Sequence, residues 1–259
     1  MDVKTATRVF RVLNLFAEVR TPLIYSEIAQ RLELPLSSCH ALLKTMVACG
    51  YLYEPGIRSG YYPTQRLLHV AQAICSADPL ISLFAPILAE LRDATRETAV
   101  LAKLADDQVV YLSVVESNQM IRYAHEPGGF KALHATASGK ALLGALDFKQ
   151  RKKLLDSYKR WDKVTASTIV DRKELEAEVE EGLRRGWHHS FGENVDDVAA
   201  IAQGFLLCGE AYSLVVAGPL HRIQRNEHAI AGAISQAKLQ IPENLLSPIR
   251  EKPEKPGLP

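Results

Sequence analysis

The sequence contains little cysteine and no long apolar run. Its 259 residues include four cysteines, at positions 39, 49, 75 and 208, and no C-x-x-C pair. This spacing excludes a dense disulfide framework and a zinc cluster, so we expect reduced, mostly buried thiols. No apolar run approaches the ~20 residues that a membrane-spanning helix needs, and the N-terminus lacks the apolar core of a signal peptide. We therefore expect a cytoplasmic protein without a membrane partner.

An excess of one sign of charge is also missing, because 31 basic and 30 acidic residues leave a net charge of +1. The chain as a whole is therefore not a polycation. Residues 1–75 hold eight Lys or Arg and five Asp or Glu, a balance of +3, whereas the remaining residues have a balance of −2. This uneven placement favours phosphate binding by the N-terminal part of the chain.

Residues 22–50 form the most informative segment. Apolar residues recur there at helical spacing on both sides of a short turn, which predicts a helix over residues 26–32 and a second helix from about Pro35. The exposed face of the second helix is small and polar, as entry into a DNA major groove requires. The residues expected to contact DNA on that face are Ser37, Ser38, His40, Ala41, Lys44 and Thr45.

A short hairpin is predicted after this helix-turn-helix. Residues 51–54 and 60–63 are β-type segments that flank a turn rich in glycine and proline. They would form the wing of a winged helix, and a further helix is expected around residues 9–16. Arg58 lies near the tip of the wing, where it would reach DNA phosphate or the minor groove, or remain a solvated turn charge.

The rest of the chain mixes helical and strand patterns. We expect helices over residues 64–77 and 80–96, separated by Asp78-Pro79. Strand patterns then cover residues 98–105, 108–116, 121–125, 187–191, 198–207 and 212–217, and helical patterns cover residues 138–146, 175–185 and 224–240. This order predicts an α+β domain around a mainly antiparallel sheet. We therefore divide the chain into a winged helix-turn-helix DNA-binding domain (1–63), a linker helix (64–79), a C-terminal domain (80–242) and a disordered tail (243–259).

Residues 129–143, GFKALHATASGKALL, form a second distinctive stretch. Ser138-Gly139-Lys140 opens a helix after a polar turn, so free N–H groups and the helix dipole would hold a carboxylate or another anion there. The stretch is not a phosphate-binding Walker A loop, because His134 and Ala141 occupy positions where that motif needs glycine and a hydroxyl residue. A plain helix start capped by Ser138 would give the same pattern.

Patterns of catalytic and metal-binding residues are missing. The chain has no G-x-S-x-G nucleophile turn, and the acids Glu193, Asp196 and Asp197 have no evident nucleophile beside them. His188 and His189 are adjacent on an expected strand, so their side chains point to opposite faces and do not converge on one metal ion. We expect no catalytic residue, no metal and no cofactor.

The two distinctive stretches together resemble the IclR family of bacterial transcriptional regulators over about residues 5–240. The resemblance rests on YSEIAQRLELPLSSCHALLK (25–44), YPTQRLL (62–68), HATASGKALL (134–143), Gly186-Trp187 and Ala217-Gly218-Pro219. It implies a GAF-like effector-binding domain after the linker helix, and a homodimer or dimer of dimers that controls catabolic genes. It also implies that a small-molecule effector alters binding of the protein to a double-stranded DNA operator.

The resemblance places the effector beside the helix start at Ala137, Ser138 and Gly139, with strand residues as the other walls. The sequence departs from the family there: Ser190 replaces a common acid, Ala200 a common cysteine, and Val215 and Ala217 common hydroxyl residues. We therefore expect an apolar pocket suited to an aromatic or larger organic acid, or a weakened response to effectors. Polar contacts are then expected from Glu193 and Asn194.

A departure also occurs in the recognition helix, where Ala41 replaces an arginine found in many relatives. One contact with phosphate or a base would thus be missing. The alternative function is a metabolite-binding protein or enzyme whose winged helix mediates protein contacts. The small, basic groove face favours DNA, and the missing nucleophile–base pair argues against catalysis.

Overall fold

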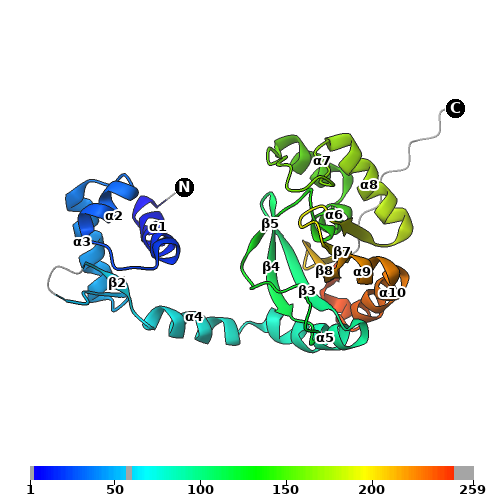
Figure 1. Cartoon of the computed structure of the whole chain (residues 1–259), viewed down its shortest axis with the longest axis horizontal. Coiled ribbons are helices and arrows are strands. Elements are labelled where there is room, and N and C mark those ends of the chain that lie inside the picture. The colour runs from blue at the N-terminus through cyan, green and yellow to red at the C-terminus, as the bar shows by residue number, and fades with distance from the viewer. Residues whose placement is uncertain (1–2, 57–59, 248–259) are drawn as a thin grey trace. The chain divides into compact units, whose positions relative to one another are not determined.

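The structure is a computed structural model that describes residues 3–56 and 60–247. It contains two compact units, residues 1–78 and residues 79–259, which we call the first and second units (Figure 1).

The first unit is a winged helix-turn-helix. Its elements are α1 (Lys4–Val19), α2 (Tyr25–Arg31), α3 (Leu36–Ala48), β1 (Leu52–Tyr53), β2 (Tyr62–Pro63) and α4 (Arg66–Ser76). Strands β1 and β2 pair antiparallel, and Leu23 makes a further bridge to Tyr61. Fully buried side chains of α1, α2 and α3, among them Val12, Ile28 and Leu43, form one core. The predicted helix-turn-helix and wing are therefore confirmed.

The cysteines differ in exposure. Cys39 is buried on the inner face of α3, but Cys49, Cys75 and Cys208 are exposed, so the prediction of mostly buried thiols is wrong. The exposed thiols lie at or near the ends of elements, where no core face is available.

Within residues 3–56 and 60–247, no single helix is long and apolar enough to cross a membrane. The helices Arg66–Cys75 and Pro79–Thr95 pass the test of length and composition only together, as a bent pair.

The second unit is built on an antiparallel sheet with the strand order β5-β4-β3-β8-β7-β6, in which β9 also pairs with β7. The strands are β3 (Thr98–Ala105), β4 (Gln108–Val115), β5 (Phe130–Ala132), β6 (His188–Phe191), β7 (Val198–Leu207), β8 (Glu210–Pro219) and β9 (Leu246–Ser247). The β7–β8 hairpin turns through Cys208 and Gly209, both with positive φ, as a tight two-residue turn requires. The predicted α+β class and mainly antiparallel sheet are confirmed.

Helices cover both faces of the sheet (Figure 1). The apolar cluster on one face includes side chains from α5 (Pro79–Thr95), α9 (Leu220–Arg225) and α10 (Glu227–Lys238). The other face packs against α6 (Ala137–Ala145), α7 (Phe148–Ser157) and α8 (Arg172–Arg185). Because β8 is covered on both faces, residues 211–218 are buried without the usual alternation.

Several predicted boundaries are wrong for identifiable physical reasons. Residues 121–125 are not a strand, because side chains bind their carbonyl groups: Thr98 Oγ1 donates to Tyr123 O at 2.6 Å and Arg222 Nη2 to Ile121 O at 2.9 Å. The sheet edge is instead formed by β5. The helix expected over residues 224–240 is divided at Asn226 into α9 and α10.

Two further elements differ from the prediction. Helix α7 was not expected, although Asp147 and Gln150 form a capping box at its start. The disordered tail expected from residue 243 is wrong for residues 243–247, which form a 3₁₀ turn (Glu243–Leu245) and strand β9. Residues 248–259 lie outside the described part of the chain.

Candidate functional site

The exposed face of α3 carries the residues predicted to contact DNA. Ser37, His40, Ala41, Lys44 and Thr45 are exposed, and Ser38 is half-buried. The opposite face of α3 packs Cys39, Leu42, Leu43 and Met46 into the core, which fixes the rotation of the helix. Arg58 lies outside the described residues.

The polar groups of this face are not all free. Lys44 Nζ lies 2.9 Å from Glu54 Oε1, and the Glu54 residue follows β1. The Lys44 ammonium holds the pKa of the Glu54 carboxyl below its usual range, and the Tyr61 hydroxyl and His40 contribute in the same direction. Thr45 Oγ1 donates to Ala41 O at 3.0 Å, and the His40 ring packs edge-on against Tyr25.

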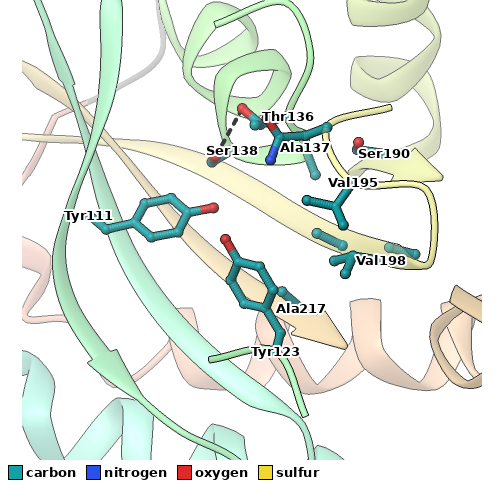
Figure 2. A pocket seen from close by; sticks show the side chains of 12 residues that line it. Tyr111, Tyr123, Thr136, Ala137, Ser138, Ser190, Val195, Val198 and Ala217 are labelled. Carbon is teal, nitrogen blue, oxygen red and sulfur yellow. Dashed lines mark hydrogen bonds between the residues drawn. The ribbon is translucent and has the colours of Figure 1, made fainter. Parts of the chain in front are cut away.

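A small cavity lies in the second unit at the start of α6, where β6, β7 and β8 pass beneath it. Its volume is about 30 Å³. It is lined by Tyr111, Tyr123, Thr136, Ala137, Ser138, Ser190, Asn194, Val195, Val198, Ala199, Ala200 and Ala217. The strand side is made of alanine and valine, whereas hydroxyl groups gather at the helix end (Figure 2).

The helix end of the cavity is a cluster of hydrogen-bond donors. Thr136 caps α6 by accepting from Gly139 N at 3.1 Å, and Ser138 Oγ donates to Thr136 Oγ1 at 3.2 Å. The cap is thus Thr136 and not Ser138. No hydrogen bond engages the backbone N–H groups of Ala137 and Ser138 among the described residues. They point outward at the positive end of the helix dipole, an arrangement that favours an anion.

Two tyrosine rings close the cavity on the side away from β7. Their hydroxyls point toward each other and toward Ser138 (Figure 2). Burial raises the pKa of Tyr111, and the nearby Ser138 and Tyr123 hydroxyls act in the opposite direction. Burial also raises the pKa of Tyr123. Both phenols therefore stay protonated and can donate to a carboxylate.

The cavity includes some of the predicted effector residues and excludes others. Ala137, Ser138, Ser190, Asn194, Ala200 and Ala217 line it. Gly139 does not, because it faces the backbone of Leu133: a Cβ on Gly139 would lie 1.9 Å from Leu133 O. Val215 is fully buried in the apolar cluster beneath α6. This cavity is thus not lined by three of the residues predicted to contact the effector: Gly139, Val215 and Glu193.

Glu193 has a different environment from the one predicted. Its Oε1 lies 2.7 Å from Lys140 Nζ, and the two side chains are 9% and 1% exposed. Lys140 also donates to His189 O at 3.0 Å, whereas Glu193 Oε2 has no hydrogen-bond partner within the described residues. This buried ion pair joins α6 to the loop that carries Asn194 and Val195 into the cavity wall.

Sequence reasoning missed the two tyrosines, Thr136, Val195, Val198 and Ala199. Tyr111 follows from the alternation of β4 and could have been found from it. Tyr123 was assigned to a strand that does not exist, so its direction was unpredictable. Val198 and Ala199 belong to β7, whose relation to the cavity depends on pairing: Ala200 lies opposite Ala217 in the register.

His134, His188 and His189 pack among other side chains of the second unit. Within the described residues, no group of three or more His, Cys, Asp and Glu side chains is arranged to hold a metal. Burial lowers the pKa of His188 to about 4, and His189 lies 3.1 Å from Glu227. Glu227 also accepts from Trp187 Nε1 at 3.0 Å. His134 is buried, lies 2.6 Å from the Tyr158 hydroxyl and packs against Trp161.

Comparison with known proteins finds one family across the chain. The model of the bacterial transcriptional regulator IclR C-terminal domain matches residues 72–243, and that of the IclR helix-turn-helix domain matches residues 5–56. The Probable transcriptional regulator SauR of Cupriavidus necator is 33% identical over 76% of this chain and 78% of its own length. The Acetate operon repressor of Salmonella typhimurium is 28% identical over 78% of this chain and 74% of its own.

A similar solved structure contains a bound aromatic acid. It is an IclR homolog from Microbacterium hydrocarbonoxydans complexed with 4-hydroxybenzoate, with a TM-score of 0.69 and 25% identity. The alignment covers 91% of this chain and 99% of that one.

Proposed function

This chain belongs to the IclR family of bacterial transcriptional regulators, and on that premise we propose that it controls catabolic genes in response to an organic acid. The family assigns DNA binding to the helix-turn-helix and effector binding to the C-terminal domain. Members are regulators and not enzymes, so the alternative of an enzyme that uses its winged helix for protein contacts is set aside. The catabolic role is supported by the name of the Salmonella relative, which represses an acetate operon. Such a regulator would act in the cytoplasm, where the chromosome lies.

We propose that α3 enters the major groove with Ser37, Ser38, His40, Lys44 and Thr45 toward the DNA. The support is that these side chains share one helix face, where all but the half-buried Ser38 are exposed, next to Ala41, which leaves room for the backbone to approach. A mobility-shift assay on the DNA upstream of the protein's own gene tests this proposal. We expect a stable complex with this DNA that an excess of random duplex does not displace.

The effector class rests on one observation, the two-part character of the cavity. Donors converge at one end: the free N–H groups at the start of α6 and the Tyr111 hydroxyl. The other end offers Ala200, Ala217 and two valines. A carboxylate at the helix start with an apolar body along β7 and β8 satisfies both ends.

The size of the cavity adds a condition. A cavity of about 150 Å³ holds a benzene molecule, whereas this one measures about 30 Å³ and has room for little more than water. The Tyr123 ring lines the cavity and belongs to an irregular segment (Figure 2). We therefore infer that an aromatic acid enters by displacing the Tyr123 ring while Tyr111 stays in place.

The effector proposal predicts a preference between acids and an effect of one hydroxyl. Benzoate or 4-hydroxybenzoate should raise the melting temperature of the protein more than glyoxylate at equal concentration. Tyr111→Phe should weaken binding of the aromatic acid about tenfold or more, because a hydrogen bond to a charged group contributes about 1.5–3 kcal/mol. Isothermal titration calorimetry measures the dissociation constants.

The matched control is Tyr212→Phe, which removes a hydroxyl bound to Glu210 in the same unit but outside the cavity. It should leave the dissociation constant unchanged. A preference for glyoxylate-sized acids, or equal loss in both variants, would contradict the proposal.

We also propose self-association as a homodimer or dimer of dimers. Phe10 of α1 is 65% exposed, and Leu68 and Ile74 of α4 are 54% and 68% exposed. None of the described side chains of α4 is buried, although a helix this short needs tertiary packing for stability. A second copy would cover these side chains. Light scattering should give about two or four times the chain mass of 28.7 kDa, and a monomeric mass would contradict the proposal.

A further inference from the structure

A carboxylate lies on the face of α3 that is proposed to read DNA. Glu54 Oε1 is 2.9 Å from Lys44 Nζ, and the side chains of Glu54 and Lys44 are 46% and 54% exposed. The Tyr61 hydroxyl and His40 lie close enough to this carboxylate to stabilise its charged form. Tyr61 is itself fixed, since its backbone pairs with Leu23 at 2.8 and 3.2 Å.

This arrangement offsets the one permanent cation among the predicted contacts on α3. Of Ser37, Ser38, His40, Ala41, Lys44 and Thr45, only Lys44 carries a permanent positive charge. Sequence-independent affinity for DNA comes from cations that neutralise phosphates and release counterions. While Lys44 is paired with Glu54, the carboxylate offsets the positive charge that a phosphate would meet. The α3 face is therefore nearly neutral toward a phosphate backbone.

A carboxylate in the major groove is tolerated only where a base offers a donor. The amino groups of cytosine and adenine are the donors that a groove presents there, and glutamate accepts from cytosine N4 in such contacts. DNA without an amino group at that position would leave the second carboxylate oxygen of Glu54, the one not paired with Lys44, without a donor. Glu54 thus weakens binding to DNA that lacks such an amino group more than binding to DNA that has one.

We propose that Glu54 is a specificity-determining residue that weakens binding of this protein to non-operator DNA. The inference rests on the proposed DNA-reading role of α3. Glu54 acts in two ways: it holds Lys44 away from phosphates, and it presents an acceptor that only some base pairs satisfy.

The test compares Glu54→Gln with the wild-type chain on two DNA duplexes, one of random sequence and one from upstream of the protein's own gene. Fluorescence anisotropy over a salt series measures both affinities. Glu54→Gln should bind random duplex about five- to tenfold more tightly at low salt, and the slope of log K against log salt should steepen by about 0.9, one extra phosphate contact. Affinity for the upstream DNA should rise less, so the ratio between the two falls.

The matched control is Glu18→Gln, which removes the same charge from an exposed position on α1. It should change neither the slope nor the ratio. A second comparison uses Lys44→Ala, which leaves Glu54 uncompensated and should weaken binding to both duplexes. Adding Glu54→Gln to Lys44→Ala should restore much of the loss.

The outcomes separate this inference from the proposed function. Wild-type protein that binds neither duplex overturns both. Wild-type protein that binds the upstream DNA, with Glu54→Gln indistinguishable from Glu18→Gln, overturns the role of Glu54 alone. Weaker binding of Glu54→Gln to random duplex also overturns it, because Glu54 would then assist phosphate contact.

Discussion

Lys140→Met is expected to lower the free energy of unfolding of the second unit by about 3–5 kcal/mol. The substitution leaves the carboxylate of Glu193 buried without a cation, and loss of one partner of a buried ion pair has effects of this size. The two side chains are 1% and 9% exposed, so water cannot replace the lost ammonium. Urea denaturation followed by circular dichroism measures the difference.

Two further variants identify the cause. Lys140→Met combined with Glu193→Gln removes both charges and should recover a large part of the loss, because pairs replaced together are often nearly neutral. Lys152→Met removes a lysine from an exposed pair with Asp156 and should have little effect. A loss below about 1 kcal/mol for Lys140→Met would mean that the Glu193 loop opens to solvent at little expense.

Gly139→Ala is expected to destabilise the second unit by about 3 kcal/mol, at the upper end of the range for overpacked cores. The added Cβ would lie 1.9 Å from Leu133 O and 2.7 Å from Leu133 C. Both atoms belong to the backbone, so no side chain can rotate away. The start of α6 would have to move, and with it the N–H groups proposed to hold the effector. Gly139→Ala should therefore lower both the free energy of unfolding, measured by urea denaturation, and the affinity for the effector, measured by titration.

Gly232→Ala is the control for this prediction. Gly232 is exposed in α10, and a Cβ there meets no atom within 4 Å. The same substitution should raise stability by about 0.5–1 kcal/mol, because alanine loses less backbone entropy in a helix. The two substitutions should thus change the free energy of unfolding in opposite directions. If Gly139→Ala costs less than about 1 kcal/mol, the close approach of α6 to Leu133 is not rigid.

The sequence was sufficient where one period of hydrophobicity decided the structure. The buried face of α3 follows from the spacing of Cys39, Leu42, Leu43 and Met46, and the same spacing leaves Lys44 outside. The β3–β4 hairpin follows from the β-rich segments on both sides of Asp106-Asp107, and the φ of 53° at Asp106 suits a turn. In these elements local preference and burial agree.

The effector cavity was less predictable because it depends on contacts between distant segments. Val215 and Ala217 are two residues apart on β8 and face the same side, yet α6 covers Val215 while the cavity begins beyond the helix end at Ala217. Asn194 lines the cavity and its neighbour Glu193 pairs with Lys140. One residue of shift along a loop decides between these roles, and no periodicity encodes it.

The position of Tyr123 was also unpredictable, because it depends on hydrogen bonds from distant residues. Its segment reads as a strand by composition, but Thr98 and Arg222 bind its carbonyl groups across 25 and 101 residues of sequence. Side-chain donors so far along the chain cannot be assigned before the sheet is known. The ring that narrows the cavity was therefore found only in the structure.

The positions of the two tryptophans have a practical consequence for optical measurements. Trp161 packs against His134 and Tyr158, and Trp187 donates to Glu227, so both indoles lie in the second unit. Tryptophan emission should therefore report on the second unit alone, and the winged helix should be silent at that wavelength. Because Trp161 contacts the segment that leads into α6, its emission should also respond when a carboxylate occupies the helix start.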